Sequence, residues 1–203
     1  MSKKLIIVFE GIEGSGKSYH LNNVANYLRK INKKFIKIRE PGGNKNSEKI
    51  RKLILHNKST FNKNTDLLLY LAARSENAEI IKKNIGKKII LIDRFVDSTI
   101  AYQHFGMGVN LKIINNINSL LLKDIRISFT FLNLVNEKNM KKRLIKRRSL
   151  NRYDRFKSTF YKKVQLGFLQ LLNQNPKKYI KIDSNKNINI NKKIIIDKIN
   201  KLI

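Results

Sequence analysis

Hydrophobic and polar positions along this chain follow two alternating patterns, short apolar runs and longer segments with helical spacing. The short runs are rich in β-branched residues, which is typical of strands inside a parallel sheet, and the longer segments are amphipathic. We expect strands at residues 5–10, 35–39, 88–93, 128–134 and 179–183. We expect helices at residues 18–31, 47–56, 65–85, 96–102, 111–122, 137–146, 158–173 and 190–203.

This alternation predicts the fold class, a doubly wound α/β domain with a parallel five-stranded sheet flanked by helices. The chain has 203 residues, which is within the range of one compact domain, and it has no internal repeat. Its two prolines, Pro41 and Pro176, fall between the expected elements. We therefore expect residues 1–203 to form a single domain.

Cysteine is absent, which excludes a disulfide framework, a thiolate metal site and a thiol nucleophile. The apolar run at residues 5–9 is too short for the core of a signal peptide, and the acidic Glu10 follows it directly. No later apolar stretch is long enough to span a bilayer. We expect a soluble, cytoplasmic protein without a membrane partner.

The net charge of +30 arises from 44 Lys and Arg residues against 14 Asp and Glu residues. Such a charge can indicate a nucleic-acid partner, because cations that neutralise phosphates release counterions. The lysines are nevertheless scattered through every segment and accompany many Asn and Ile residues, a pattern typical of compositional drift at exposed positions. Neither a recognition motif nor an aromatic stacking platform accompanies the charge. We favour drift and expect no dedicated nucleic-acid partner.

A phosphate-binding loop follows the first expected strand. It consists of Gly11, Ile12, Glu13, Gly14, Ser15, Gly16, Lys17 and Ser18, which fits the pattern G-x-x-x-x-G-K-[ST]. Glycines let backbone N–H groups surround a phosphate, and the helix that follows adds the positive end of its dipole. Lys17 can reach the β- and γ-phosphates, and Ser18 can offer its hydroxyl to Mg²⁺. The loop predicts binding of ATP or GTP but does not identify the acceptor.

The third expected strand ends in Asp93, at the edge of the sheet where ligands of open α/β folds bind. This carboxylate can hold Mg²⁺ directly or through water, as a strand-end aspartate does in other P-loop enzymes. The alternative is an ordinary helix cap. Because Arg94 follows at once, we favour the metal site.

Three pairs of side chains stand four positions apart on expected helices or directly at the end of one, so the members of each pair share a helix face. The pairs are Tyr70 with Arg74, Thr99 with Gln103, and Ser98 with Tyr102. Tyr70 offers a flat ring for stacking, and Arg74 a guanidinium that can donate to a base carbonyl. Together they can hold a pyrimidine, the interpretation that we favour, and an ordinary aromatic core position is the alternative for Tyr70.

Several segments resemble bacterial thymidylate kinases, in the order and spacing of that family. Residues 91–103 (L-I-D-R-F-V-D-S-T-I-A-Y-Q) resemble its Asp-Arg-aromatic, Ser, Ala-Tyr-Gln signature, and residues 39–43 (R-E-P-G-G) its Arg-Glu-Pro-Gly-Gly segment. Residues 68–74 (L-L-Y-L-A-A-R) are similar to its dTMP-binding helix, with Tyr70 where the family has Phe. With the phosphate loop and a basic lid, the resemblance covers residues 5 to about 165. It implies a homodimeric kinase that uses Mg²⁺ and transfers the γ-phosphoryl group of ATP to dTMP.

The resemblance also implies roles around the acceptor. Arg39 and Arg94 would clamp the phosphate of dTMP, a task that suits planar bidentate donors. Thr99 and Gln103 would lie near the thymine edge. Tyr102 would pack against the deoxyribose and disfavour a 2′-hydroxyl. Ser98 belongs to the same substrate-binding segment. After it, residues 104–108 (H-F-G-M-G) depart from the family's common Gly-x-Gly-Arg-Gly.

Glu13 places a carboxylate inside the phosphate loop, and the resemblance implies a position near the 3′-hydroxyl of the acceptor and the phosphates. The loop has no arginine, so additional positive charge for the transferred group is expected from a lid at about residues 146–157. There residues 151–154 (N-R-Y-D) occupy the place of the family's common Asp-Arg-Phe-Glu. Arg152 is the expected catalytic arginine of the lid, and Arg148, also expected at the ATP, is the alternative. A solvated basic loop is the other interpretation.

The catalytic set expected from these arguments is Lys17, Glu13, Asp93, Arg94 and Arg152. Two other functions remain to be separated from dTMP phosphorylation. A deoxynucleoside kinase would need a carboxylate base beside a 5′-hydroxyl, whereas Arg39 and Arg94 favour an acceptor that already carries a phosphate. A P-loop protein that binds nucleic acid would need a contiguous basic surface away from the nucleotide cleft.

Overall fold

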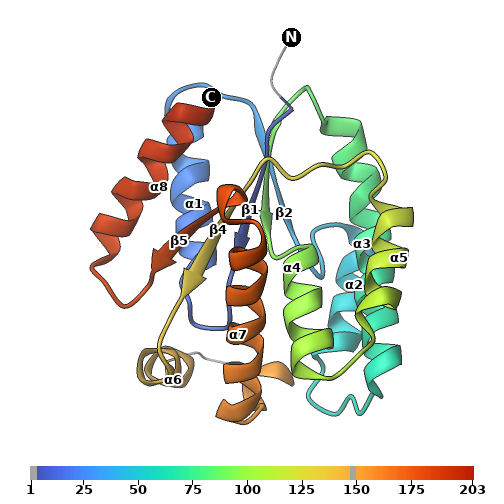
Figure 1. Cartoon of the computed structure of the whole chain (residues 1–203). Helices are drawn as coiled ribbons and strands as arrows, with labels where there is room; N and C mark the ends of the chain where they lie inside the picture. The colour runs from blue at the N-terminus through green and yellow to red at the C-terminus, as the bar shows by residue number, and fades with distance from the viewer. Residues whose placement is uncertain (1–3, 147–149) are drawn as a thin grey trace.

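A computed structural model describes residues 4–146 and 150–203 of the chain. Its centre is one parallel sheet with the strand order β2-β3-β1-β4-β5 (Figure 1). The strands are β1 (Ile6–Glu10), β2 (Phe35–Arg39), β3 (Ile89–Asp93), β4 (Phe129–Leu134) and β5 (Tyr179–Asp183). The expected five-stranded parallel sheet is therefore confirmed, and each strand lies within one residue of the range expected from the sequence.

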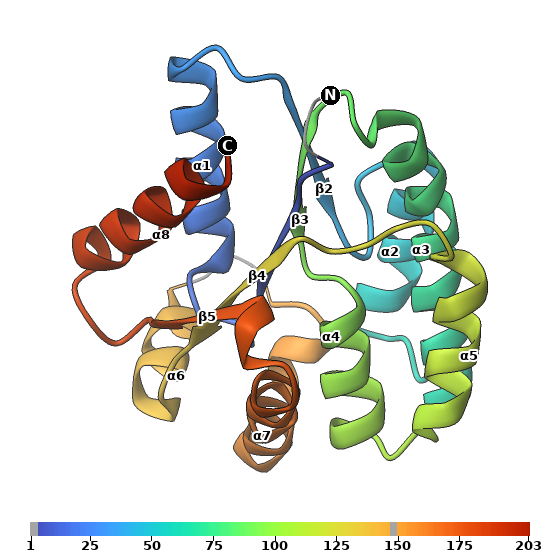
Figure 2. The same cartoon turned by 45° about the horizontal axis from the view of Figure 1, so that its top comes forward.

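Helices cover both faces of the sheet (Figures 1 and 2). On one face lie α1 (Lys17–Lys30) and α8 (Ile188–Leu202). On the other lie α2 (Lys45–Leu55), α3 (Lys63–Asn84), α5 (Leu111–Leu121) and α7 (Ser158–Gln174). Side chains alternate along β1, so that Phe9 packs in a cluster with Leu28 of α1 while Val8 packs in a cluster with Ile81 of α3. This two-sided burial explains why β1 is apolar without interruption until Glu10.

Two short helical segments lie near the carboxyl ends of the strands, at the bottom of Figure 1. They are α6 (Glu137–Ile145), which follows β4, and the short 3₁₀ helix η2 (Tyr153–Arg155). A second 3₁₀ helix, η3 (Pro176–Lys178), connects α7 to β5. Among the described residues, no helix combines the length and the apolar character that crossing a membrane requires.

The expected α-helix at residues 96–102 is wrong in type and in length. The chain forms α4 (Val96–Thr99) and then continues as a π-helix, η1 (Ile100–Gly106). The wider turn is visible in the hydrogen bond from the N–H of Met107 to the carbonyl of Tyr102, 3.0 Å away and five residues earlier. Apolar spacing alone cannot distinguish this turn from an α-helical one, and the packing of η1 against α7 extends the helical segment to Gly106.

Two glycines allow η1 and α7 to approach closely. A Cβ atom at Gly167 would lie 2.5 Å from Cδ2 and 3.0 Å from Cβ of Phe105. A Cβ atom at Gly106 would lie 2.6 Å from Cε2 of Phe160, at the far end of that ring. Each helix thus places a phenyl ring against the bare backbone of the other. Because Cβ of Phe105 is fixed to the backbone, the contact at Gly167 is the less adaptable of the two.

Gly167→Ala should destabilise the protein despite the better helix propensity of alanine. Alanine in place of glycine favours a helix interior by about 1 kcal/mol, whereas overpacking costs about 1–3 kcal/mol. We expect a net loss in the free energy of unfolding of about 1 kcal/mol, measured by urea denaturation. Gln170→Ala, on the exposed face of the same helix, is the control and should be nearly neutral. A more stable Gly167→Ala variant would contradict the packing argument.

Candidate active site

One pocket opens at the carboxyl ends of β1, β2 and β3, where the loops that follow these strands meet α3, η1 and residues 151–153. Lys17 and Ser18 of the phosphate loop line it, and so do Arg74 of α3 and Gln103 of η1. The phosphate-binding and base-binding residues expected from the sequence therefore share one cavity. This is the edge at which open α/β sheets bind ligands.

The phosphate loop folds as its glycines require. Gly11 has a φ of 138°, and a Cβ atom there would lie 2.3 Å from the carbonyl oxygen of Asn133 in β4. Gly16 has a φ of 84° and is the N-terminal cap of α1, so the helix begins at Lys17. Lys17 is buried, and burial, together with the nearby charge of Arg94, lowers its pKa to about 8. The ammonium group donates to the carbonyl of Ile12 over 3.4 Å, and no carboxylate of the described residues lies within ion-pair distance of it.

Ser18 and Asp93 bring a hydroxyl and a carboxylate together at the start of α1 and the end of β3. The Ser18 hydroxyl donates to Oδ2 of Asp93 over 2.5 Å. The other oxygen, Oδ1, is buried and has no partner among the described residues. The two residues expected to hold Mg²⁺ are therefore adjacent, and both offer the oxygen ligands that this ion prefers.

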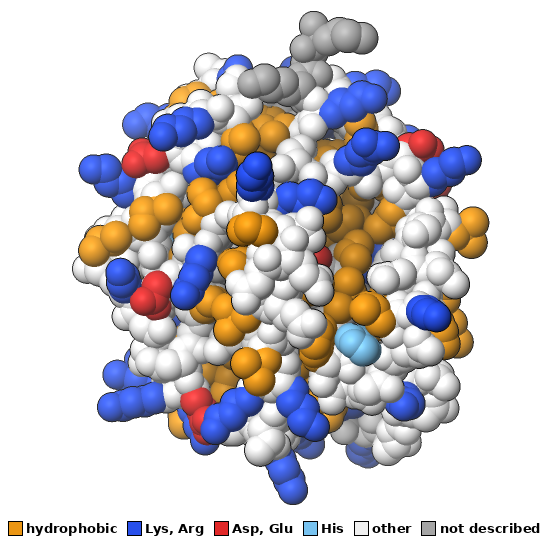
Figure 3. Space-filling view, viewed as in Figure 1, with side chains coloured by type: hydrophobic (Ala, Val, Ile, Leu, Met, Phe, Trp, Pro, Cys, Tyr) orange, Lys and Arg blue, Asp and Glu red, His pale blue; other side chains and the backbone are white. Residues whose placement is uncertain are grey.

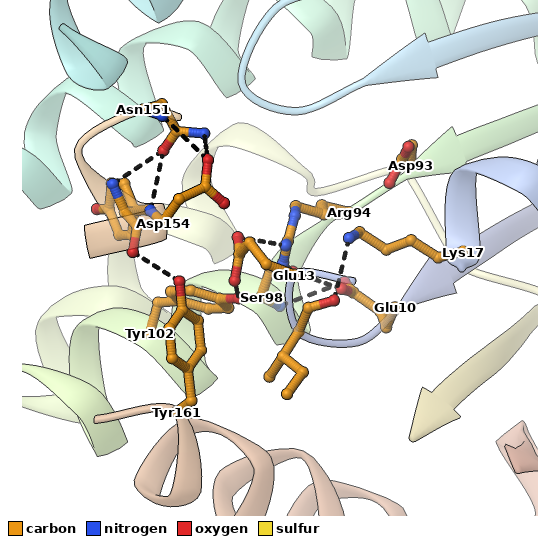
Figure 4. Close-up of polar contacts among 12 residues, drawn as sticks. Glu10, Glu13, Lys17, Asp93, Arg94, Ser98, Tyr102, Asn151, Asp154 and Tyr161 are labelled. Atoms are coloured by element: carbon orange, nitrogen blue, oxygen red, sulfur yellow. Dashed lines mark hydrogen bonds and ion pairs between the residues drawn. The ribbon is translucent and has the colours of Figure 1, made fainter. Parts of the chain in front are cut away.

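Glu13 lies between Arg94 and Tyr102 (Figure 4). Arg94 donates to Oε1 of Glu13 over 2.6 Å, and the Tyr102 hydroxyl donates to Oε2. The Arg94 guanidinium also lies over the ring of Tyr102, with Cζ 5.0 Å from the ring centroid. Burial raises the pKa of Glu13, but the charges of Arg94 and Lys17 more than reverse this, so the pKa lies below its usual value. Glu13 is thus an anion embedded among cations.

Glu10, the last residue of β1, anchors the beginning of α4. Its Oε1 accepts from the backbone N–H groups of Phe95, at 2.7 Å, and of Ser98, at 3.2 Å. Its Oε2 accepts from the Ser98 hydroxyl, which in turn accepts from Arg94 over 3.2 Å. Burial and the charge of Asp97 raise the pKa of Glu10 to about 7. These bonds fix the loop after β3 against the phosphate loop.

Arg74 lies at the floor of the pocket and is almost completely buried. Its Nε donates to Glu40 over 2.8 Å, Nη1 to Oδ1 of Asn118 over 2.8 Å, and Nη2 to the Thr99 hydroxyl over 2.8 Å. Burial raises the pKa of Glu40, and the charge of Arg74 opposes this. The guanidinium is therefore neutralised and fixed in orientation before any ligand binds.

The aromatic wall beside Arg74 comes from Tyr70, Tyr102 and Tyr153. The ring of Tyr153 meets those of Tyr70 and Tyr102 edge-on, with centroids 6.0 and 5.8 Å apart. Burial and the charge of Asp66 raise the pKa of Tyr70, so its phenol stays neutral. All three rings line the pocket, which gives it flat apolar surfaces beside its polar floor.

Cationic side chains from the end of β2 and from α2 line the mouth of the pocket. Arg39 donates to Oε1 of Glu48 from Nε at 3.1 Å and from Nη2 at 2.8 Å. The Arg39 side chain remains 53% exposed, so this guanidinium is free to turn toward a ligand. Arg51 of α2 is more buried and donates to the carbonyl of Pro41 over 2.7 Å. Both line the same pocket as Arg94.

Of the lid expected at about residues 146–157, the structure describes residue 146 and residues 150–157. Arg152 forms an ion pair with Asp66 of α3, and Asn151 and Tyr153 on either side of it line the pocket. Arg148 lies outside the described residues. The expected catalytic arginine is thus held by a buried carboxylate, next to the residues expected to bind the base.

Comparison with known proteins identifies the family. A sequence model of thymidylate kinase matches residues 9–195. Thymidylate kinase from Mycoplasma capricolum is 37% identical over 204 residues, covering 96% of each chain, and that from Sulfurihydrogenibium sp. is 36% identical over 94% of each. The crystal structure of thymidylate kinase from Ehrlichia chaffeensis superposes with a TM-score of 0.79 at 31% identity, covering 98% of this chain and 99% of that one. The chain belongs to the thymidylate kinase family.

In this thymidylate kinase family member, the two polar faces expected at residues 98–103 face different partners. Ser98 and Tyr102 contact Glu10 and Glu13, on the side of the phosphate loop. Thr99 and Gln103 instead contact residues of α3, the first through Arg74 and the second through Asp66. The members of each pair expected from four-residue spacing therefore face the same side of the site, although the helix widens into η1.

Sequence reasoning missed several residues of this thymidylate kinase site. Asp66 stands four positions before Tyr70 and eight before Arg74, so helical spacing could have identified it. Arg51 stands four positions after Ser47, which is buried against α3. The same helical spacing therefore places Arg51 on the inward face of α2. Glu40 lies within the recognised R-E-P-G-G segment, yet only the fold places it against Arg74.

The depressed pKa of Lys17 predicts how this kinase responds to alkaline pH. Lys17 must be protonated to attract phosphates, so kcat/KM for ATP should fall as pH rises above about 8, the pKa in the free protein. Steady-state kinetics between about pH 6 and pH 10 measure this. Lys17→Arg, whose charge persists across that range, is the control, and its residual activity should lack the alkaline fall. A wild-type profile that is flat to about pH 9.5 would contradict the assignment.

Proposed function

We propose that this pocket is where the chain transfers the γ-phosphoryl group of ATP to dTMP, giving dTDP and ADP for dTTP synthesis. The chain belongs to a family of kinases that use these two substrates. The observation that carries the assignment is that a phosphate-binding Lys17 and a buried, fixed Arg74 line one cavity. A phosphoryl donor and a nucleotide base can therefore be bound on opposite sides of it.

On the donor side, the backbone of residues 11–18 would surround the phosphates of ATP. Lys17, at the beginning of α1, would neutralise the β- and γ-phosphates and is the first of the proposed catalytic residues. Glu13, held by Arg94 and Tyr102, would face the acceptor's 3′-hydroxyl and the phosphates. We regard residues 1–203 as one kinase domain because a single sheet carries both sides.

Mg²⁺ fits the oxygen ligands at the junction of Ser18 and Asp93. One buried Asp93 oxygen has no hydrogen-bond partner in the part of the chain that the structure describes, which is consistent with a carboxylate that faces a cation. No cluster of three or more His, Cys, Asp or Glu side chains could hold a metal ion among the described residues, so phosphate and water oxygens would complete the coordination. When bound, the ion would neutralise charge on the phosphates.

On the acceptor side, Arg39 and Arg94 would bind the phosphate of dTMP, and the partly buried Arg51 is a third donor at the same mouth. Tyr70 would stack on the thymine ring while Arg74 donates to a base carbonyl. Three residues of α4 and η1, Ser98, Thr99 and Gln103, would contact the nucleotide from the other side. Tyr102 would pack against the deoxyribose, where its bond to Glu13 leaves little room for a 2′-hydroxyl.

The lid at about residues 146–157 would supply positive charge during transfer. Arg152 remains our candidate for the catalytic arginine, and Arg148 the alternative. Arg152 is paired with Asp66, so it would have to leave this carboxylate to reach the phosphates. Such a movement is typical of lids that close over a substrate.

We further propose a homodimer, no dedicated nucleic-acid partner and a cytoplasmic location, where both substrates are available. Exposed leucines on neighbouring helices, Leu68 on α3 and Leu120 on α5, support an apolar contact between copies. Lys and Arg are dispersed over the face in Figure 3 and do not gather into one patch. Sedimentation of the protein alone and with duplex DNA tests the first two proposals. A monomer would refute the homodimer, and co-sedimentation with DNA at physiological salt would refute the absence of a nucleic-acid partner.

An ATP-consumption assay across acceptors tests the function itself. We expect dTMP to be the best acceptor among dTMP, dUMP, dCMP, dGMP, AMP and thymidine, because Arg39 and Arg94 provide for a phosphate and Arg74 for a base carbonyl. Thymidine should not be used. Lys17→Ala is the control for adventitious ATPase and should abolish turnover with the fold intact by circular dichroism. Faster turnover of thymidine than of dTMP would indicate a nucleoside kinase instead.

Arg152→Ala should lower kcat by about 10³ with little change in dTMP affinity, because a lid arginine acts on charge that develops during transfer. Arg148→Ala should do less, and the exposed Arg155→Ala is the matched control and should retain kcat. Steady-state kinetics with calorimetric dTMP binding measure this. Thermal unfolding of Arg152→Ala checks that the variant stays folded although Asp66 has lost its ion-pair partner. A large loss of kcat in Arg148→Ala alone would show that Arg148, and not Arg152, is the catalytic arginine. Near-normal kcat in both variants would show that the lid is a solvated basic loop without a catalytic arginine.

A further inference from the structure

Asp66 is a buried carboxylate that belongs to neither the phosphate loop nor the acceptor motifs. It lies on α3 and is 1% exposed. Its Oδ1 pairs with Arg152 of the lid. Its Oδ2 accepts from the Tyr153 hydroxyl over 2.5 Å and from Nε2 of Gln103 over 3.1 Å. One side chain thus joins α3, η1 and the lid.

This arrangement determines how the Gln103 amide is turned. Tyr153 gives its only hydroxyl proton to Asp66, so its oxygen presents lone pairs to Gln103, whose Nε2 lies 3.2 Å away. The ionised carboxylate of Asp66 also has acceptors alone. Both groups that face this end of the amide are acceptors, so the NH₂ group must occupy it and the carbonyl must occupy the other end. None of the residues that the structure describes donates to that carbonyl oxygen, Oε1 of Gln103.

Arg74 provides the complementary half of the polar floor. An arginine can only donate, and Glu40, Asn118 and Thr99 hold this one in place. Gln103 and Arg74 line the same pocket, which therefore offers a fixed acceptor beside a fixed donor. A 4-oxo pyrimidine presents the matching pair, an N3–H donor and an O4 acceptor. Cytosine presents the reverse, an N3 acceptor and a 4-amino donor, and would leave both protein groups unpaired.

We propose that Asp66 is a positioning residue that fixes the Gln103 amide, with Tyr153, so that the pocket selects a 4-oxo pyrimidine over cytosine. This inference rests on the proposed function, since it assumes that the base of the acceptor binds between Gln103 and Arg74. Tyr153 and Arg152 both belong to the lid segment, so docking of that segment on α3 adds the Tyr153 hydroxyl to the acceptor that Asp66 already offers Gln103. Base selection and docking of the lid therefore depend on the same carboxylate.

Asp66→Asn tests the proposal because an asparagine can donate as well as accept, which allows the Gln103 amide to turn over. The measurement is kcat/KM for dTMP and for dCMP, with calorimetric binding of each nucleotide in the absence of ATP. We expect the ratio of dTMP to dCMP to fall by about tenfold or more, because an adaptable amide no longer leaves cytosine unpaired. Asn191→Ala removes a partly buried hydrogen bond on the other face of the sheet, and it should leave the ratio of dTMP to dCMP unchanged in both kinetics and binding.

Tyr153→Phe keeps the ring and removes the hydroxyl, and it carries the test if Asp66→Asn fails to fold. Asp66 still accepts from Gln103 in this variant, so the ratio should fall by a smaller factor, about threefold. Equal losses for dTMP and dCMP in a folded Asp66→Asn protein, or an unchanged ratio in Tyr153→Phe when it alone is folded, would overturn the positioning role. Those outcomes leave dTMP phosphorylation by the wild type intact. A wild type that does not prefer dTMP would refute the proposed function instead.

Discussion

The ion pair between Glu13 and Arg94 is the interaction on which the rest of the site depends. It joins the phosphate loop after β1 to the loop after β3, and Tyr102 of η1 donates to the same carboxylate. Leaving either charge buried without the other would cost several kcal/mol, so the two loops and η1 hold together as one unit. Arg94 reaches Glu13 from a backbone with a φ of 67°, a conformation that few residues other than glycine adopt. The backbone is thus fixed at the point where the donor and acceptor sides meet.

Around this ion pair, positively and negatively charged side chains from different segments lie close together. Lys17 and Arg94 face Glu13, and Asp93 lies next to Ser18. Among the described residues, five Lys and Arg residues line the pocket against three Asp and Glu residues, a small share of the +30 that the whole chain carries. The large net charge therefore has little to do with how the site is built. A local field of this kind is preorganised, because its charges are held by burial and hydrogen bonds before a substrate arrives.

A second buried carboxylate, Asp66, organises the base-binding side as Glu13 organises the phosphate side. Each accepts from a tyrosine and pairs with an arginine, and each connects segments that are far apart in the sequence. Tyr102 and Tyr153 also contact each other edge-on, so the two halves share an aromatic boundary. The pocket is thus a set of fixed donors and acceptors on either side of an apolar wall.

The sequence by itself determined the five strands, the helices between them and the phosphate loop. It also determined that Ser98 shares one helix face with Tyr102 and that Thr99 shares another with Gln103. These features depend on local spacing, which can be recognised in the sequence because strands and helices repeat at fixed periods. Only the tertiary structure decided that residues 100–106 widen into a π-helix, that Glu40 neutralises Arg74 and that Arg152 pairs with Asp66. These partners are 34 and 86 residues apart. Which buried charges meet across such separations depends on how the helices pack, and no periodicity in the chain records it.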